Sequence, residues 1–370
     1  MGRALLYPPD GDVFTAVYAA ARLCVMPEPA ARRASGARGK WVKPVSAPLK
    51  SLHHPWLAST GPQNGDLVVI TPESTGWQYS GLHVLRLEPG VMRTVLTGDS
   101  EVFVLPLAGG LTLEAADAGT PANTRARYGL AGRMSVFERV TDFAYVGRDS
   151  LVRLISANGA EVAIPSARCE QQLPPMYGPA SGAQVEVRGA GPATCQMTNF
   201  GTPGVWDHAE RLVACELITP AGNWSSYPPH KHDATDPCTV VNEEIYFFKI
   251  AGPDRLTPSR EGFGLHRTFT GPEHEHAGLA EIDTTVEVRD GDAFCIPYGY
   301  HGPSVAAPGY DMYYLNVLAG PGPERSMAFC DDPAHGWVRD TWASLALDPR
   351  CPVTSADGRL DGAHLHDQPT

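Results

Sequence analysis

Residues 222–233, GNWSSYPPHKHD, are the most informative part of this chain, together with EEIYFF (243–248) and PYGYHG (297–302) further along. On an extended strand, side chains two residues apart point to the same face. His230 and His232 would therefore face the same way, and two imidazoles on one face of a strand can bind one metal ion. The lysine between them would point to the opposite face. This stretch predicts a strand that carries two ligands of a metal site.

A carboxylate for the same site is expected at the start of the next strand. Only one of Glu243 and Glu244 can face the histidine pair, since neighbouring side chains on a strand point to opposite faces. Glu244 directly precedes the apolar run and is the candidate ligand, while Glu243 is expected to face outward. His301, which follows the sequence Pro-Tyr-Gly-Tyr, is the fourth candidate. Three imidazoles and one carboxylate suit Zn, Mn, Fe, Ni or Co, and the ligands alone leave that choice open.

Two further His-x-His pairs occur, at His274/His276 and His364/His366. No strand with an acidic residue follows either pair, so both are expected in solvated loops or in the tail. Because a histidine binds a metal ion only when it is neutral, activity at the first site is expected to fall on the acid side.

The rest of the sequence, from about residue 65 onward, predicts a fold built of strands. Short apolar and β-branched runs such as DLVVITP (66–72) and GLHVLRLEPG (81–90) each end in turn-forming residues. This pattern, with little helical periodicity, is typical of an all-β sandwich or barrel. SEVFVLPLAGG (100–110) and NEEIYFFKIAG (242–252) resemble each other, which indicates one β fold used twice.

Composition excludes several classes of function. Hydrophobic residues make up 43% and charged residues 19% of the 370 residues, which is enough for a buried core. The formal net charge of −12, without a basic patch, disfavours nucleic acid as a partner. No apolar run reaches the ~20 residues that span a bilayer, so no membrane partner is expected. The eight cysteines form no C-x-x-C pair, which favours reduced thiols and a cytoplasmic protein.

The combined motif spacing points to a known family. G-x(7)-H-x-H, a Glu at a strand start and G-x(5)-P-x-G-x-H are similar to the two motifs of cupins, which are small double-sheet jelly rolls. The longer strings GNWSSYPPHKHD, GFGLHRTFT, GDAFCIPYGYH and DDPAHGWV resemble the 5-deoxy-glucuronate isomerase family of bacterial myo-inositol catabolism, as does ITPESTGWQYSGLHVLRLEPG in the first half. The resemblance extends from about residue 66 to about 350.

The resemblance implies an all-β bicupin, with two tandem jelly-roll cupin barrels behind a largely disordered or loosely attached extension at residues 1–63. An upstream misassigned start would give that extension the same look. The N-terminal barrel (64–185) keeps an acidic strand at Glu101 but no His-x-His, so it is expected to hold no metal. The C-terminal barrel (186–352) would hold one divalent ion, most often zinc, with manganese or iron as alternatives; residues 353–370 would be a flexible tail. The implied ligands are His230, His232, Glu244 and His301.

The implied reaction is isomerisation of 5-deoxy-D-glucuronate, a small sugar acid, to 5-dehydro-2-deoxy-D-gluconate by an intramolecular oxidoreductase that works as a homo-oligomer. Moving a carbonyl from C1 to C2 through an enediol requires a Lewis acid and a base that takes the C2 proton. Tyr246 should point into the barrel beside Glu244, and Tyr314 and Asn316 on another strand could do likewise. Arg267 is the candidate for binding the substrate carboxylate, because Arg binds carboxylates in bidentate fashion. The sequence does not identify the base.

Three alternatives remain open from the sequence. The related 5-dehydro-4-deoxy-D-glucuronate isomerase of pectin breakdown uses a similar metal cupin. A metal-dependent cupin dioxygenase would use the same ligands with iron and would consume oxygen. A sugar-binding bicupin without catalysis is disfavoured, because a pure binder has no need of four metal ligands.

Overall fold

The computed structural model describes residues 52–55, 65–117 and 125–360, all within one compact unit that spans residues 42–370. The expected all-β fold is confirmed, since the helices in the described part of the chain are short turns and none could cross a membrane. These turns are α2 (Pro72–Thr75), α3 (Pro272–His276), α4 (Val338–Thr341), η4 (Ala180–Gly182), η5 (Gly191–Ala193) and η6 (Trp342–Ser344).

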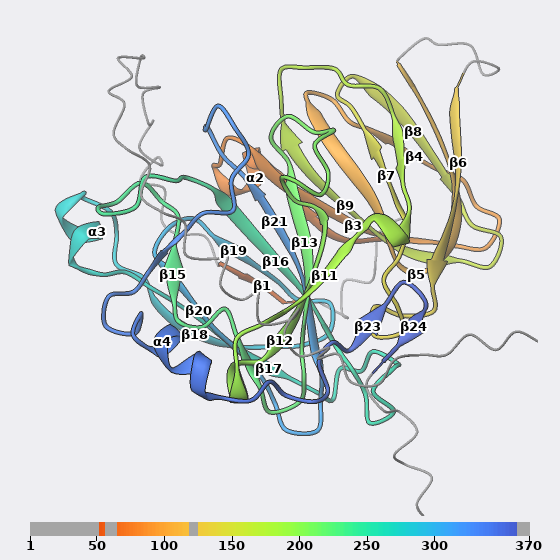
Figure 1. Cartoon of the computed structure of the whole chain (residues 1–370). Coiled ribbons are helices and arrows are strands. Elements are labelled where there is room, and N and C mark those ends of the chain that lie inside the picture. Colours follow the sequence, from red (N-terminus) through yellow and green to blue (C-terminus); the bar gives the residue numbers. More distant parts are fainter. Residues whose placement is uncertain (1–51, 56–64, 118–124, 361–370) are drawn as a thin grey trace, which may run out of the picture. The chain divides into compact units, whose positions relative to one another are not determined.

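One antiparallel sheet of seven strands lies at the centre of the second half of the chain (Figure 1). Its order is β1 (His53–His54), β19 (Ala293–Ile296), β16 (Glu243–Ile250), β21 (Met312–Ala319), β13 (Val213–Thr219), β12 (Cys195–Gly201) and β11 (Gln184–Arg188). Strand β1 belongs to the stretch that was expected to be loosely attached, yet it pairs with β19 in register. Residues 1–51 and 56–63 lie outside the described residues.

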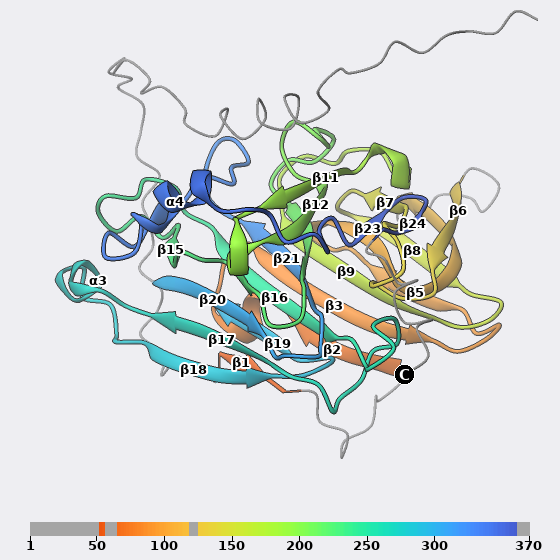
Figure 2. The same ribbon diagram turned by 60° about the horizontal axis from the view of Figure 1, so that its bottom comes forward.

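A second sheet of six strands belongs to the same half. Figure 2 shows three of its members, β17, β18 and β20, side by side. The full order is β18 (Asp283–Val288), β17 (Gly264–Phe269), β20 (Tyr300–Ala306), β15 (His230–Lys231) and β22 (Cys330–Asp331), with β14 (Trp224–Ser225) paired to β20.

The first half of the chain forms a nine-stranded sheet that bends through the long strand β5 (Ser100–Asp117). The main path is β10 (Met176–Gly178), β7 (Phe143–Val146), β5, β9 (Ala160–Arg168), β3 (Ser80–Leu87) and β2 (Asp66–Ile70). The C-terminal part of β5 pairs with β6 (Ala126–Arg133) and β8 (Ser150–Ile155), and β8 pairs with β4 (Arg93–Leu96).

The same strand order occurs in both halves. The path β10-β7-β5-β9-β3-β2 corresponds position by position to β1-β19-β16-β21-β13-β12. The edge strand β1 of the second half's sheet comes from the segment just before β2, where the first half begins. The edge strand β10 of the first half's sheet comes from the segment just before β11, where the second half begins. The topology therefore agrees with the internal repeat that the sequence indicates.

Period-two alternation along β16 separates two cores. Tyr246 and Phe248 pack into an aromatic cluster inside the second half, whereas Ile245 and Phe247 pack into a cluster shared with side chains of the first half such as Phe103. The interior of the first half is a third cluster, made of Leu, Val, Ile and Ala side chains. A side chain at the start of β16 therefore faces either the interior of the second half or the first half of the chain.

The stretch expected to be a flexible tail begins with a hairpin that is buried at Val353 and Thr354. Strands β23 (Thr354–Ser355) and β24 (Gly358–Arg359) pair with each other, and Val353 is completely buried. The Gln196 side chain accepts hydrogen bonds from the Val353 and Thr354 backbone N–H groups. Residues 353–360 are thus part of the fold, and residues 361–370 lie outside the described residues.

Candidate metal centre

Three side chains predicted as metal ligands converge at one buried point. Glu244 Oε2 lies 2.9 Å from His232 Nε2 and 2.9 Å from His301 Nε2. The three ligand atoms lie within 4.8 Å of one another, and all three residues are buried. Among the described residues this is the one group of three or more His, Cys, Asp or Glu side chains with such geometry.

The two sheets of the second half bring these ligands together. Glu244 is the second residue of β16. Because side chains two residues apart on a strand share a face, Glu244 faces the interior of the second half together with Tyr246. His301 enters from β20 in the opposite sheet, where it is the Cα partner of His230 on β15. Gly302 has a φ of +93°, and a Cβ there would collide with the carbonyl oxygen of Ser226. Only glycine therefore lets the backbone at Ser226 approach β20 next to His301.

The hydrogen bonds of the imidazoles show that a cation fits between these groups. His232 Nδ1 lies 3.1 Å from the Asn242 carbonyl oxygen, and a carbonyl can only accept, so Nδ1 carries a proton. His232 Nε2 lies 2.9 Å from Glu244 Oε2, to which it donates a hydrogen bond when the ring is protonated and presents a lone pair when the ring is neutral. His301 Nε2 is buried and has no hydrogen-bond partner, although the Glu244 carboxylate oxygen is adjacent. A buried carboxylate between two imidazole nitrogens requires positive charge beside it, which a cation bound by neutral rings supplies, as does a protonated ring.

The electrostatics of the cluster agree with that fit. Burial lowers the pKa of His232, but the neighbouring Glu244 carboxylate outweighs burial and the net shift is upward. Burial raises the pKa of Glu244, but the neighbouring His301 and His232 outweigh burial and hold this pKa well below its usual range. The carboxyl group is therefore ionised at neutral pH. The Glu244 carboxylate therefore attracts positive charge, and these three side chains could hold a cation once the imidazoles are neutral.

His230, the fourth predicted ligand, lies beside the cluster and not within it. Its ring centroid is 4.5 Å from that of His301 and 4.6 Å from that of Phe329, and its Nδ1 lies 3.2 Å from the Pro228 carbonyl oxygen. It is the partly exposed member of the set. Burial and the nearby His301 hold the pKa of His230 well below its ordinary value, so the ring is neutral at physiological pH.

Tyr246 and Tyr314, predicted to contact substrate, lie together next to the ligands. Their ring centroids are 4.6 Å apart, and that of Tyr246 is 6.1 Å from that of His301. Ser226 Oγ lies within hydrogen-bond distance of both hydroxyls, at 3.1 Å from Tyr246 and 2.9 Å from Tyr314. Asn316, opposite Tyr246 in the sheet, has a buried Oδ1 without a hydrogen-bond partner. These polar groups face the interior that holds the ligands.

The structure does not bring Arg267 to this group. Residues of β17 alternate between exposed and buried, and Arg267 lies on the outer face, where it is 3.3 Å from Asp283 and stacks on Phe269. The inward side chain is its neighbour His266, whose ring centroid lies 5.3 Å from that of Tyr246. Burial, followed by the nearby His301, lowers the pKa of His266 to about 3. The same alternation that selects Glu244 would have selected His266.

A buried polar network lies on the opposite face of the ligand strand, where the lysine between the histidines was expected to point. Lys231 is completely buried, with Nζ 2.8 Å from Glu273 Oε1. Asp233 Oδ2 accepts hydrogen bonds from His274 Nε2 (2.7 Å) and from the Gly299 backbone N–H (2.7 Å). Asp233 thereby joins the segment of His232 to the turn that precedes His301.

His274 corrects an expectation from the sequence. It was predicted to lie in a solvated loop, yet it is completely buried on α3, because Asp233, 41 residues earlier, supplies its partner. No local pattern reveals that pairing. His276 is exposed, in agreement with the prediction, and His364 and His366 lie outside the described residues.

The first half of the chain lacks the ligand at the position equivalent to Glu244. When residues 100–110 are aligned with residues 242–252, Glu101 corresponds to Glu243 and Val102 corresponds to Glu244. Val102 belongs to the apolar interior of the first half. Glu101, the acidic residue that the sequence analysis noted on this strand, accepts backbone hydrogen bonds from Glu210, Arg211 and Leu212.

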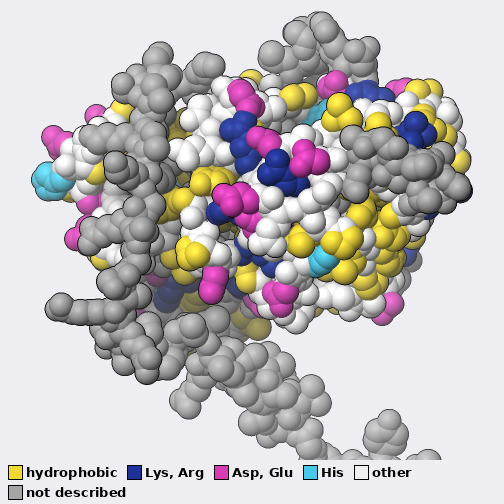
Figure 3. All heavy atoms as spheres, turned by 90° about the horizontal axis from the view of Figure 1, so that it is seen from above, with side chains coloured by type: hydrophobic (Ala, Val, Ile, Leu, Met, Phe, Trp, Pro, Cys, Tyr) yellow, Lys and Arg dark blue, Asp and Glu magenta, His cyan; other side chains and the backbone are white. Residues whose placement is uncertain are grey.

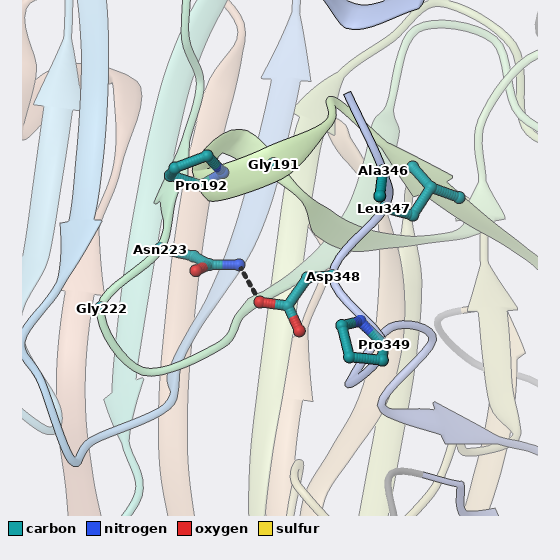
Figure 4. Close-up of a pocket in the computed structure, with 8 residues that line it drawn as sticks. All are labelled: Gly191, Pro192, Gly222, Asn223, Ala346, Leu347, Asp348 and Pro349. Carbon is teal, nitrogen blue, oxygen red and sulfur yellow. Dashed lines mark hydrogen bonds between the residues drawn. The ribbon is translucent and has the colours of Figure 1, made fainter. Parts of the chain in front are cut away.

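A shallow surface hollow of about 380 Å³ lies near the opposite end of β20 from His301 (Figure 4). Its polar side chains satisfy each other, since Asn223 donates to Asp348. On the face shown in Figure 3, basic side chains alternate with acidic ones in the described part of the chain.

Comparison with known proteins gives consistent matches. The model of the KduI/IolB family matches residues 56–338. A protein of Geobacillus kaustophilus named 5-deoxy-glucuronate isomerase is 36% identical over 281 residues, which is 75% of this chain and 92% of that protein. The Bacillus subtilis (strain 168) protein of the same name is 32% identical over 276 residues, covering 73% and 91%. The crystal structure of an IolB-like protein from Salmonella typhimurium superimposes with a TM-score of 0.66 at 28% identity, covering 78% of this chain and 99% of that one.

Proposed function

The chain belongs to the KduI/IolB family, and on this premise we propose that it is an isomerase that converts 5-deoxy-D-glucuronate to 5-dehydro-2-deoxy-D-gluconate. The observation that carries the proposal is that relatives at 32–36% identity, matched over more than nine tenths of their length, are named 5-deoxy-glucuronate isomerase. The converging His232, Glu244 and His301 support it, because they form a buried site suited to carbonyl chemistry.

We propose that the two halves are tandem cupin barrels, of which only the second binds metal. The matched strand order of the two central sheets supports a repeated fold. The apolar interior of the first half and Val102 at the position of Glu244 support a first barrel without metal. We further propose that the enzyme works in the cytoplasm as a homo-oligomer in myo-inositol degradation, as the family resemblance implies.

The proposed cofactor is one divalent cation, zinc first, with manganese or iron as alternatives. His232, Glu244 and His301 would hold it, with His230 as the fourth ligand from the more exposed side. Such a cation, when bound, polarises a carbonyl oxygen and stabilises the negative charge that develops on it. Imidazole and carboxylate ligands are compatible with all three metals, so the geometry alone does not select zinc.

The remaining polar side chains would bind the sugar acid and move protons between its oxygens. We assign the hydroxyl groups of Tyr246 and Tyr314, linked through Ser226 Oγ, to the substrate hydroxyls near the carbonyl. Burial raises the pKa of Tyr246 well above its ordinary value, so this hydroxyl stays protonated and can donate. The unpaired Asn316 Oδ1 would accept a hydrogen bond from a further sugar hydroxyl.

Proton NMR of the full-length protein with 5-deoxy-D-glucuronate in deuterated buffer tests the proposal. The expected result is loss of the anomeric signals and growth of the 2-deoxy-5-keto acid, with deuterium at C2 of the product if a base exchanges the proton. H232A is the matched control that removes one ligand. Conversion of 5-dehydro-4-deoxy-D-glucuronate instead would favour the related isomerase, oxygen uptake would favour a dioxygenase, and binding without conversion would favour a sugar-binding protein.

A further inference from the structure

Glu243, the neighbour of the ligand Glu244, binds the first half of the chain. Its Oε1 accepts the Gln78 backbone N–H (2.7 Å), and its Oε2 accepts those of Tyr79 (2.8 Å) and Ser80 (2.9 Å). The Ser80 hydroxyl also donates to the Glu243 carbonyl oxygen at 2.9 Å. One carboxylate thus holds three consecutive N–H groups just before β3, the strand that continues from Ser80.

Glu101 makes the same contact in the reverse direction. From the first half it accepts three consecutive backbone N–H groups of the second half, from Glu210 (2.9 Å), Arg211 (2.6 Å) and Leu212 (2.7 Å), just before β13. The Tyr145 hydroxyl adds a fourth hydrogen bond at 2.7 Å. The two carboxylates are equivalent by the repeat and cross-link the halves in both directions.

The residues that flank the two carboxylates differ in one respect that bears on metal binding. Glu243 lies between Glu244, whose carboxylate is in the cluster, and Asn242, whose carbonyl oxygen accepts the Nδ1–H of His232 at 3.1 Å. The Asn242 backbone N–H also donates to the His232 carbonyl oxygen at 2.9 Å. Glu101 is followed by the apolar Val102. Only Glu243 therefore sits between one ligand and the group that orients another.

We propose that Glu243 is a positioning residue for the metal centre, through which the first half of the chain holds Glu244 and the Asn242 carbonyl in the geometry that binds the cation. This inference rests on the proposed metal site. Groups that orient the ligands of a metal typically change its affinity by about 10- to 100-fold when they are removed. The half without metal thus contributes to the chemistry of the half that binds it, and Glu101 supplies the symmetric cross-link without that role.

The matched pair E243Q and E101Q separates positioning from general loosening. Each substitution removes the charge of a carboxylate that accepts three backbone N–H groups across the same interface. We would titrate the metal-free full-length proteins with Co(II) against a competing chelator and record the visible absorption of bound Co(II). The expected result is at least about tenfold weaker Co(II) binding and a shifted d–d band in E243Q. E101Q should retain the wild-type spectrum and bind within about threefold of wild-type affinity, since its neighbour Val102 lies in an apolar interior and not in the metal site.

Each other outcome overturns the inference in a distinct way. Equal weakening in both variants, or wild-type binding in both, would show that Glu243 acts only on stability or not at all. A wild-type protein that binds no Co(II) would remove the metal site itself, and the inference with it. Thermal unfolding of the metal-free proteins checks that both variants fold. If E243Q does not fold, S80A, which removes only the hydroxyl that donates to the Glu243 carbonyl, must still weaken Co(II) binding, and unchanged binding would refute the proposal.

Discussion

His230 and His301 are Cα partners on the antiparallel strands β15 and β20, with ring centroids 4.5 Å apart. His301 has an unpaired, buried Nε2 that faces Glu244, while His230 lies outside the group of three converging ligands and is partly exposed. The pair therefore separates a buried set of three side chains from a fourth, partly exposed imidazole beside them.

The first prediction follows from that difference. H230A should weaken Zn(II) binding by about tenfold while leaving one ion per chain, because three converging ligands remain, whereas H232A should abolish stoichiometric binding. Isothermal titration of the metal-free proteins measures both. H276A, which changes an exposed histidine, is the control. Wild-type affinity in H230A would restrict the site to three protein ligands.

The second prediction compares inward with outward side chains. Y246F should lower kcat/KM by at least about tenfold, because it removes a hydroxyl expected to contact substrate next to His301. R267A should leave kcat and KM unchanged, since Arg267 lies on the outer face beside Asp283. Steady-state kinetics of Y246F and R267A with 5-deoxy-D-glucuronate measures both effects. A large increase of KM in R267A would restore the sequence-based assignment of Arg267 to the substrate carboxylate.

The third prediction concerns acid stability. Burial raises the pKa of Asp233, but hydrogen bonds from His274, Thr235 and the Gly299 N–H outweigh it and hold the pKa well below its usual range. A carboxyl with a depressed folded-state pKa stabilises the fold above its unfolded pKa of about 3.9, and this contribution is lost as the pH falls through that value and below. In thermal unfolding of the metal-free proteins, kept in a buffer with a chelator, D233N should be less stable than wild type at pH 7. Between about pH 5 and pH 3 it should lose less stability than wild type loses.

The control for this experiment is D283N, because Asp283 is exposed and its carboxyl contacts only the surface residue Arg267 among the described ion pairs. Its thermal unfolding should follow the wild-type pH dependence. A D233N protein with the full wild-type loss of stability in acid would show that the contact between Asp233 and His274 does not depend on the ionised carboxylate.

The fourth prediction addresses how the halves are held together. Arg133, at the end of β6, forms a buried ion pair with Glu216 on β13, and the Tyr313 hydroxyl donates to the same carboxylate at 2.7 Å. R133M should lower the free energy of unfolding by about 3–5 kcal/mol, because it leaves a buried carboxylate without its cation. The double variant R133M/E216L should recover most of that loss in urea denaturation. A cost below about 1 kcal/mol for R133M would contradict a structural role of this pair.

Local spacing predicted three side chains that converge in the structure, and it did not predict their surroundings. His-x-His spacing and strand alternation pointed to His232 and Glu244, because both rules concern residues that are close in the sequence. His232 directly follows the end of β15. Alternation also assigned Glu243 to the opposite face, but its backbone partners, more than 160 residues away, have no signature in the sequence. The buried pairing of His274 with Asp233 was missed for the same reason.

Two further differences arise from how segments dock. The β1 strand and the hairpin of residues 353–360 lie in stretches whose composition suggested loose attachment, yet each is held by partners in the second half. For His53–His54 the partner is β19, and for Thr354 it is the Gln196 side chain. The composition of a segment indicates how much apolar surface it can bury. It does not indicate that an edge strand elsewhere in the chain has unpaired backbone groups with which the segment can pair.

Isomerisation is proposed to depend on a cation held by His232, Glu244 and His301. The most direct test is to remove metal from the full-length protein with a chelator, measure conversion of 5-deoxy-D-glucuronate by proton NMR, and then add one equivalent of Zn(II), Mn(II) or Fe(II) per chain. The account predicts that conversion stops in the metal-free protein and returns with at least one of the three ions, and that E244Q is not restored by any of them. Full conversion by the metal-free protein would contradict it.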